Sequence, residues 1–186
     1  MNEITLAFDN REIIPINGKQ FIINPLTEQI PATTSVLLHE ACQELAMRVD
    51  KQTTKLLTEE DKGAILVAGV SIFTKLPFGM ARWYPSGIAN QIKETLDSEY
   101  VTGELYLNGI QRGDKVTIID DMISTGGTMV SMVRAVKRTG AEIVGVICIA
   151  EKIGYGGVER VRNETGYDVS VVVKVDISGK CSKVIV

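Results

Sequence analysis

The residues of this chain that are best suited to chemistry lie together at positions 116–128. The run Val-Thr-Ile-Ile is followed there by Asp120 and Asp121, and then by a short turn of hydroxyl residues and glycines. Carboxylates accept hydrogen bonds from sugar hydroxyls, and the backbone N–H groups at a helix N-terminus hold a phosphate. Gly126 and Gly127 carry no Cβ, so the backbone can approach a ligand closely. These residue types and this spacing suit the binding of a phosphorylated sugar.

Two widespread phosphate-binding motifs do not match this run. A Walker A loop needs a Lys directly after its glycine, whereas Gly127 is followed by Thr128. The run is not the G-x-G-x-x-G turn of dinucleotide-binding folds either. A purely structural role, with acids that cap and glycines that turn, stays open. The density of acids, hydroxyls and glycines at the end of a strand favours a ligand site, because open α/β sheets bind ligands at that edge.

Apolar periodicity places the run in an alternation of strands and helices. The best-defined helix follows the glycines, where Met129, Met132, Val133 and Val136 share one face and Gly140 ends the helix. The alternation predicts an α/β fold with a central, mostly parallel sheet flanked by helices. We expect short strands and turns over 11–30, including a strand at 21–23. Further strands are expected at 54–58, 77–82, 104–107, 115–119, 143–150 and 169–176, and helices at 34–49, 64–74, 126–139 and 157–165, with the last strand closing the chain.

One long stretch, residues 83–103, shows neither the helical nor the strand spacing of apolar residues. It contains aromatic residues, a proline, two glycines and mixed charges. Connections of this length in compact domains are usually lids or binding loops. We therefore expect a long flexible loop there, inside a single domain that covers residues 1–186.

Composition narrows the class of protein. The 20 basic and 23 acidic residues give a formal net charge of −3, which disfavours a nucleic-acid partner. No apolar run approaches the roughly 18 residues of a membrane span, and the N-terminus lacks the pattern of a secretory signal. Three widely spaced cysteines favour free thiols in a reducing compartment. The sequence thus predicts a cytoplasmic protein without a membrane partner.

The run at 120–128 resembles the phosphoribosyl diphosphate (PRPP) binding motif of the type I phosphoribosyltransferases. The resemblance implies that Asp120 and Asp121 take the ribose 2′- and 3′-hydroxyls, and that residues 124–128 cradle the 5′-phosphate. It also implies the fold of that family, with a small N-terminal hood formed by about residues 1–35. The PRPP-binding residues implied in this way are Asp120, Asp121, Met122, Ile123, Ser124, Thr125, Gly126, Gly127 and Thr128.

Further stretches are similar to two branches of this family. Ser98-Glu99-Tyr100 resembles the flexible loop of adenine phosphoribosyltransferases, which makes Glu99 and Tyr100 candidate catalytic residues beside Asp120 and Asp121. Residues 103–114 are similar to the archaeal hypoxanthine/guanine enzymes. Ser124 and Glu151 are closer to the adenine enzymes. We expect adenine as the favoured base, with hypoxanthine, guanine or xanthine as the alternative.

The chain departs from the family where diphosphate is held. Residues 58–63 read Thr-Glu-Glu-Asp-Lys-Gly, with Lys62 at the position where adenine enzymes keep Arg. Three acids beside a diphosphate repel it unless Lys62 or Mg²⁺ intervenes. Of the basic segment after the next strand only Arg82 is left. The resemblance assigns the diphosphate to Lys62, Gly63 and Arg82, and the base to Phe21 and Leu26 of the hood.

Together these features predict a purine salvage enzyme that moves the phosphoribosyl group of PRPP onto a purine base. The resemblance implies a Mg²⁺ cofactor, organised indirectly by Asp120 and Asp121 together with PRPP, and a homodimer. The altered diphosphate segment leaves a second class open, a PRPP- or nucleotide-binding regulator on the same fold. A phosphosugar-binding α/β domain with an unrelated reaction is a third possibility.

Overall fold

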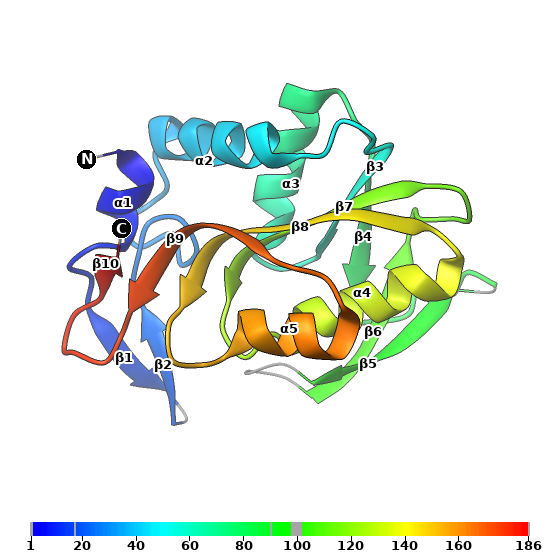
Figure 1. Ribbon diagram of the computed structural model, residues 1–186. Helices are drawn as coiled ribbons and strands as arrows, with labels where there is room; N and C mark the ends of the chain where they lie inside the picture. The colour runs from blue at the N-terminus through cyan, green and yellow to red at the C-terminus, as the bar shows by residue number, and fades with distance from the viewer. Residues whose placement is uncertain (1, 17, 90, 98–101, 186) are drawn as a thin grey trace.

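The computed structural model describes residues 2–16, 18–89, 91–97 and 102–185. Within these ranges a central sheet is covered by helices on both faces, and a two-stranded hairpin stands beside it near the two termini (Figure 1). The helices are α1 (Glu3–Phe8), α2 (Ser35–Arg48), α3 (Gly63–Thr74), α4 (Gly127–Thr139) and α5 (Gly157–Thr165). The strands are β1 (Ile13–Ile16), β2 (Lys19–Ile22), β3 (Lys55–Glu59), β4 (Phe78–Arg82), β5 (Ile92–Asp97), β6 (Thr102–Asn108), β7 (Lys115–Ile123), β8 (Glu142–Lys152), β9 (Ser170–Asp176) and β10 (Lys183–Ile185).

The large sheet has the strand order β10-β9-β8-β7-β3-β4-β6-β5 in the described residues. Its middle strands, from β9 to β4, are parallel, and the pairs at the two edges are antiparallel. The predicted α/β fold with a mostly parallel sheet is confirmed. The parallel strands put the ends of β3, β7 and β8 at one edge of the sheet, where ligands bind in such folds.

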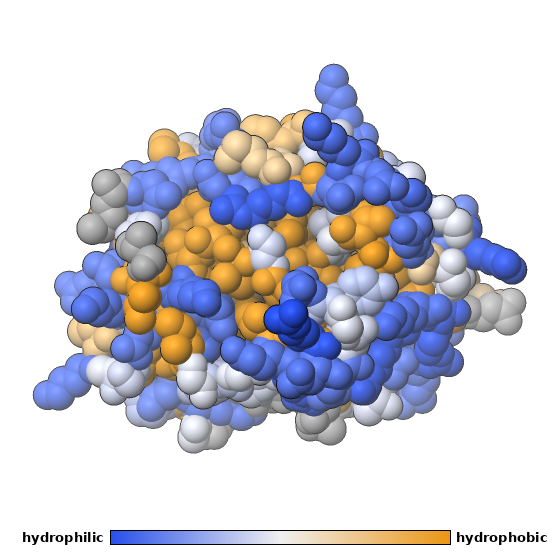
Figure 2. All heavy atoms as spheres, viewed as in Figure 1, coloured by the Kyte–Doolittle hydropathy of each residue, from blue (hydrophilic) through white to orange (hydrophobic). Residues whose placement is uncertain are grey.

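Two apolar cores sandwich the sheet. One face carries α1, α2 and α3, with Phe8, Leu45 and Val67 buried against the strands. The other face carries α4 and α5, with Met132 and Val161 buried there. Figure 2 shows that apolar side chains also gather across the middle of one face in the region of β9, whose residues 171–173 are half-buried. Helices therefore pack on both faces of the sheet whose edge carries the two aspartates.

Helix α4 begins and ends as its sequence predicts. Gly126, with φ of 77°, precedes its first turn, and Gly140, with φ of 79°, ends it. Both are left-handed conformations that glycine adopts without a Cβ clash. Met129, Met132 and Val133 are buried, as the periodicity of the helix requires.

Three elements were missed by the sequence prediction. The expectation of irregular structure throughout 83–103 was wrong for β5, which pairs antiparallel with β6 and in which Leu96 is the one completely buried residue of 92–96. A strand with one fully buried side chain gives little alternation to detect. Helix α1 and strand β10 were missed because they are too short to give a periodic signal. The expectation that the strand at 169–176 closes the chain was therefore wrong, since β10 follows it. These two end elements meet, because Ser182 Oγ donates to the Phe8 carbonyl at 2.6 Å.

Candidate functional site

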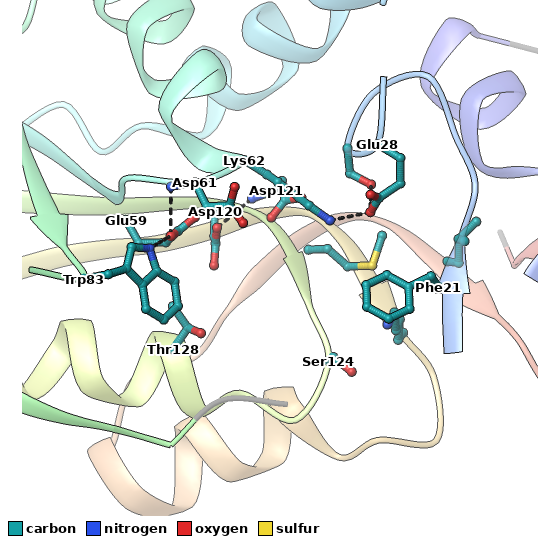
Figure 3. A pocket seen from close by; sticks show the side chains of 14 residues that line it. Phe21, Glu28, Glu59, Asp61, Lys62, Trp83, Asp120, Asp121, Ser124 and Thr128 are labelled. Carbon is teal, nitrogen blue, oxygen red and sulfur yellow. Dashed lines mark hydrogen bonds and ion pairs between the residues drawn. The ribbon is translucent and has the colours of Figure 1, made fainter. Parts of the chain in front are cut away.

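A cavity of about 460 Å³ opens at the carboxyl edge of the parallel strands (Figure 3). Its walls come from the ends of β3, β7 and β8, from the first residue after β7, from α4, and from the hood through Phe21 and Glu28. The hood is thus the lid of a pocket whose floor is the edge of the sheet. The sequence-predicted residues Asp120, Asp121 and Lys62 all line this one cavity.

The two adjacent aspartates form the acidic floor of the cavity. Asp120 and Asp121 are 5% and 8% exposed, near the end of β7, which is held between β3 and β8. The backbone N–H of Asp121 donates to Asp120 Oδ1 at 3.0 Å. This bond orients the Asp120 carboxylate, and both side chains line the cavity, where they can accept hydrogen bonds from a ligand.

Burial makes these acids reluctant to ionise. Burial, with the neighbouring charges of Asp121 and Glu59, raises the pKa of Asp120 well above its usual range. Burial raises the pKa of Asp121 to about 6, although the Lys62 ammonium opposes the shift. Burial, with the charges of Asp121 and Asp61, raises the pKa of Glu59 to about 7, although the Asp61 backbone N–H opposes the shift. Ionising these buried carboxylates therefore has a desolvation cost, to which their mutual repulsion adds, and a cation or a set of hydroxyl donors would relieve it.

Residues 124–128, called the phosphate loop after the ligand that the sequence predicts there, run from the end of β7 into the first turn of α4. Ser124 and Thr128 line the cavity, and the buried Ser124 Oγ has no hydrogen-bond partner among the described residues. The helix that follows points its first N–H groups toward this loop, which is the arrangement that holds phosphate. Residues 122–123 join this loop to the acids: Met122 lines the cavity and Ile123 is buried in the core.

Sequence reasoning missed what supports this loop from behind. A Cβ at Gly126 would lie 2.6 Å from the Gly157 carbonyl oxygen, and a Cβ at Gly157 would lie 2.1 Å from the Ser124 carbonyl oxygen. The first turn of α5 is thus in backbone contact with the phosphate loop. The run Gly-Tyr-Gly-Gly at 154–157 was the available signal, because paired glycines mark close backbone approach.

Lys62, expected to hold diphosphate, lies at the boundary between sheet and hood. Its ammonium forms an ion pair with the Glu28 carboxylate and lies 5.9 Å from the centroid of the Phe21 ring. Burial lowers the pKa of Lys62, but the hydrogen bond to Glu28 and the charges of Asp121 and Asp61 together outweigh it, so the pKa of Lys62 is raised. Lys62 is therefore a charged cation inside an acidic pocket.

The neighbouring segment is organised by two glutamates. Trp83 lines the cavity, and its Nε1 donates to Glu59 Oε2 at 3.1 Å, while its backbone N–H donates to Glu60 Oε1 at 2.8 Å. Arg82, the other expected diphosphate residue, is not among the described residues that line the cavity. Its guanidinium donates to the Tyr84 hydroxyl at 2.8 Å and lies 3.5 Å from Glu60 Oε2.

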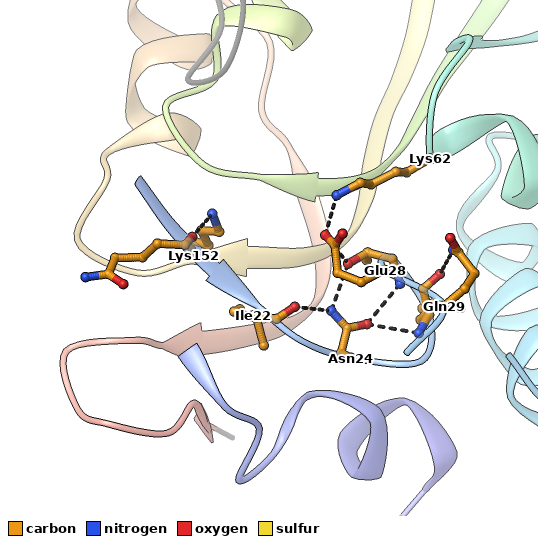
Figure 4. Close-up of polar contacts among 9 residues, drawn as sticks. Ile22, Asn24, Glu28, Gln29, Lys62 and Lys152 are labelled. Carbon is orange, nitrogen blue, oxygen red and sulfur yellow. Dashed lines mark hydrogen bonds and ion pairs between the residues drawn. The ribbon is translucent and has the colours of Figure 1, made fainter. Parts of the chain in front are cut away.

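Lys152 is a cavity residue that the sequence did not single out. It ends β8, is only 2% exposed, and its ammonium donates to the Gln20 carbonyl at 2.8 Å (Figure 4). The same ammonium lies 5.9 Å from the centroid of the Phe21 ring. A Lys at the end of a near-continuous apolar strand was the signal, since buried lysines are rare without a role.

The remaining predicted residues fall in three places. Glu99 and Tyr100 lie outside the described residues. Leu26 is 6% exposed and packs in the core beneath the hood, so it is not among the described cavity residues. Gly63 begins α3, where a Cβ would lie 2.1 Å from Thr58 Oγ1 and 3.1 Å from Asp120 Oδ1.

The described residues give no self-contained metal site. Among them, no group of three His, Cys, Asp or Glu side chains is placed to hold a metal ion. The oxygen donors of Asp120 and Asp121 suit Mg²⁺ by their chemistry, provided that a ligand supplies further oxygens.

Within the described residues, no helix has the length and apolar character needed to cross a membrane.

Comparison with known proteins agrees with this geometry. The family model of the phosphoribosyl transferase domain matches residues 84–175. The hypoxanthine/guanine phosphoribosyltransferase of Methanothermococcus okinawensis is 37% identical over 177 residues, which are 95% of this chain and 96% of that protein. That of Methanocaldococcus jannaschii is 39% identical over 158 residues, which are 84% of this chain and 85% of that protein.

Solved structures share the fold over nearly the whole chain. An adenine phosphoribosyltransferase from Rhodothermus marinus superposes with a TM-score of 0.76 at 27% identity, covering 92% of this chain and 96% of that chain. An APRTase from Giardia lamblia complexed with 9-deazaadenine gives a TM-score of 0.79 at 21% identity, covering 94% and 98%. With the acids, the phosphate loop and the hood in these positions, and with relatives of this identity along almost its full length, the chain belongs to the type I phosphoribosyltransferase family.

Proposed function

We propose that this chain transfers the 5-phosphoribosyl group of PRPP to a 6-oxopurine base, hypoxanthine or guanine, and releases diphosphate. The observation that carries the proposal is the strand end Asp120-Asp121 running into the phosphate loop within one cavity that also contains Lys62 and Lys152. Acids for a diol, amides for a phosphate and a cation for a leaving group are the parts that this transfer needs.

The choice of base differs from the expectation based on the sequence. Ser124 and Glu151 favoured adenine, but the archaeal relatives named hypoxanthine/guanine phosphoribosyltransferases, at 37% and 39% identity, support the alternative. The similarity to the Giardia lamblia structure, at 21% identity, supports the fold alone. The chemistry of the pocket agrees with the relatives, because the Lys152 ammonium is a donor suited to a 6-oxo group and unsuited to a 6-amino group.

Each residue has a defined task in this proposal. Asp120 and Asp121 accept hydrogen bonds from the ribose hydroxyls, and the N–H groups of residues 124–128 hold the 5′-phosphate. Lys62 binds the diphosphate oxygens on which negative charge grows as the bond at C1′ breaks. Phe21 provides an apolar surface for the base. Catalysis then comes from positioning and from stabilising the leaving group.

Mg²⁺ belongs to the same proposal. When bound with PRPP, it supplies positive charge to the diphosphate and the sugar hydroxyls. The raised pKa values of Glu59, Asp120 and Asp121 support this, because a carboxylate that is costly to ionise alone gains most from a nearby cation. Asp120 and Asp121 would reach the ion through PRPP, in line with the lack of a three-residue metal group in the described ranges.

The test is a panel of adenine, hypoxanthine, guanine and xanthine with PRPP and Mg²⁺, followed by diphosphate release. We expect turnover of hypoxanthine and guanine and little of adenine. Replacing both acids, Asp120→Asn with Asp121→Asn, should lower kcat/KM by about a thousandfold or more because the diol loses its acceptors. A folded double variant with unchanged turnover would refute these roles.

A second candidate is a PRPP- or nucleotide-binding regulator on the same fold. The contacts of Arg82 with Tyr84 and Glu60, and the acidic wall of Glu59 and Asp61, support it because they weaken the grip on diphosphate. Calorimetric binding of PRPP without diphosphate release on any base of the panel would favour the regulator. Failure to bind PRPP at all would point to a phosphosugar domain with another reaction.

A further inference from the structure

The hood carries one charged side chain into the cavity, the carboxylate of Glu28. This side chain lines the cavity and forms an ion pair with Lys62, with side-chain exposures of 22% for Glu28 and 29% for Lys62 (Figure 4). Glu28 and Lys62 belong to different parts of the molecule, the hood and the turn after β3. Their ion pair lies in the cavity between Phe21 of the hood, where the proposed base would rest, and the acidic floor of Asp120 and Asp121.

The segment that presents Glu28 is held in place by a buried amide. Asn24 is completely buried, and its Oδ1 accepts from the backbone N–H groups of Leu26 and Thr27, both at 2.9 Å. Its Nδ2 donates to the Ile22 carbonyl at 2.9 Å and to Thr27 Oγ1 at 2.8 Å. A satisfied buried network therefore fixes the backbone that presents Glu28, while the Glu28 carboxylate itself contacts Lys62 and accepts from Thr27 Oγ1 at 3.4 Å.

In the proposed function we expect Lys62 to leave this contact during the reaction. The proposed function requires its ammonium to bind the diphosphate of PRPP, which carries more negative charge than one carboxylate. When Lys62 turns to the diphosphate, Glu28 is left as a half-buried carboxylate without its cation. That loss is costly unless another donor replaces the ammonium.

A 6-oxopurine brings such a donor, and adenine does not. Hypoxanthine and guanine carry N1–H, and guanine adds a 2-amino group, whereas N1 of adenine is an acceptor that a carboxylate repels. We propose that Glu28 selects the base by accepting the N1–H of a 6-oxopurine once Lys62 has moved to diphosphate. This inference rests on the proposed function and names the residue that discriminates between bases.

A positive charge in the same cavity, the Lys152 ammonium, fits this role of Glu28. The ammonium groups of Lys62 and Lys152 lie on the Phe21 ring with equal 5.9 Å separations from its centroid, and Glu28 is bound to the first of them. A base resting on Phe21 would then lie between a donor, Lys152, and an acceptor, Glu28. The 6-oxo group and the N1–H of hypoxanthine or guanine present the complementary acceptor and donor on neighbouring atoms.

The test is Glu28→Gln, assayed by kcat/KM for hypoxanthine, guanine and adenine at saturating PRPP. We expect a loss of about tenfold or more for the two 6-oxopurines, with adenine unchanged or improved, because an amide can also donate to adenine N1. A matched control is Glu44→Gln, since Glu44 is also ion-paired, to Arg48, with 29% side-chain exposure and no place in the cavity. An equal loss for all three bases, or none, would overturn the role of Glu28.

A binding measurement separates this inference from the proposed function. Calorimetry of inosine and adenosine 5′-monophosphates with wild type and Glu28→Gln reports selectivity without relying on turnover, provided that Mg²⁺ and methylenediphosphonate, a diphosphate analogue, are present to engage Lys62. Wild type should prefer the inosine nucleotide, and the variant should lose that preference. If wild type turns over no purine, the proposed function fails while the nucleotide preference still decides for or against Glu28. If Glu28→Gln melts earlier than wild type, Glu28→Asp keeps the charge and should retain the preference.

Discussion

At the scale of single residues, the site is built from polar groups that the unliganded protein holds at a cost. Asp120, Asp121 and Glu59 are buried within one cavity, and burial raises the pKa of each. Lys62 offsets part of this repulsion for Asp121, while Asp61 adds to it. Such strain is common at ligand sites, where the ligand supplies the missing partners.

The strain predicts how stability changes with pH. Between the usual pKa of a carboxylate and its raised value, the folded state binds more protons than the unfolded state, so stability falls as pH rises. The window runs from 4.5 to about 7 for Glu59 and from 3.8 to about 6 for Asp121. We expect the Asp120→Asn, Asp121→Asn double variant to be more stable than wild type at pH 7.5, by on the order of a few kcal/mol.

Thermal melts in EDTA at pH 4.5 and pH 7.5 check the predicted pH dependence of stability. The gain in melting temperature of the double variant over wild type should be small at the lower pH and large at the higher pH. Taking the difference between two proteins cancels titrations elsewhere in the chain. An equal gain at both pH values would mean that these carboxylates are not strained in the unliganded protein.

At the scale of elements, the phosphate loop depends on contact between two helix N-termini. The first turn of α5 approaches the loop so closely that a Cβ at Gly157 would lie 2.1 Å from the Ser124 carbonyl oxygen and 2.9 Å from the Gly126 nitrogen. Backbone atoms cannot move aside as a flexible side chain can. The shape of the loop, and with it the direction of its N–H groups, is therefore set by α5 as well as by α4.

A single methyl group tests this contact. Gly157→Ala should destabilise the fold by about 1–3 kcal/mol through overpacking and should also weaken ribose 5-phosphate binding about tenfold or more. Gly69→Ala is the matched control, since its Cβ would lie 2.2 Å from Cys42 Sγ, remote from the loop. It should lose stability while keeping the affinity. Calorimetry and thermal melts together separate the two effects, and unchanged affinity in Gly157→Ala would contradict the supporting role of α5.

The local pattern of the sequence predicted the strand, turn and helix of the site, because each is encoded within a few residues. Asp120, Asp121 and the helix ending at Gly140 belong to this class. Contacts between distant residues were not predictable. Lys152 meets Gln20 across 132 positions, and Lys62 meets Glu28 across 34. Neither pairing leaves a local signature, so the end of the cavity lined by Phe21 emerges only from the fold.

At the scale of the whole molecule, apolar side chains remain exposed on α2 and α3. Val36, Met47 and Ile72 are 63%, 64% and 81% exposed. Helices α2 and α3 pack against each other, so these side chains belong to one helical layer, and apolar side chains that gather on a surface mark interaction sites in many proteins. The homodimer implied by the family resemblance would cover such a surface, so we predict self-association through these helices.

Sedimentation velocity tests the predicted dimer. Wild type should sediment as a dimer, and Ile72→Glu should shift it toward monomer because a charge at the interface would be buried without a partner. Ile185→Glu, at an apolar residue that is 44% exposed on β10, is the control and should leave the dimer intact. A wild-type monomer at micromolar concentration would remove the homodimer from the account.

In the proposed function a sugar phosphate binds where β7 passes into α4, with its diol on the acids and its phosphate on the amides. The most direct measurement is a crystal structure with inosine 5′-monophosphate and Mg²⁺ at saturating concentration. We expect density for the phosphate on residues 124–128 and for the ribose hydroxyls on Asp120 and Asp121. Nucleotide density elsewhere on the protein, or none at saturation, would contradict it.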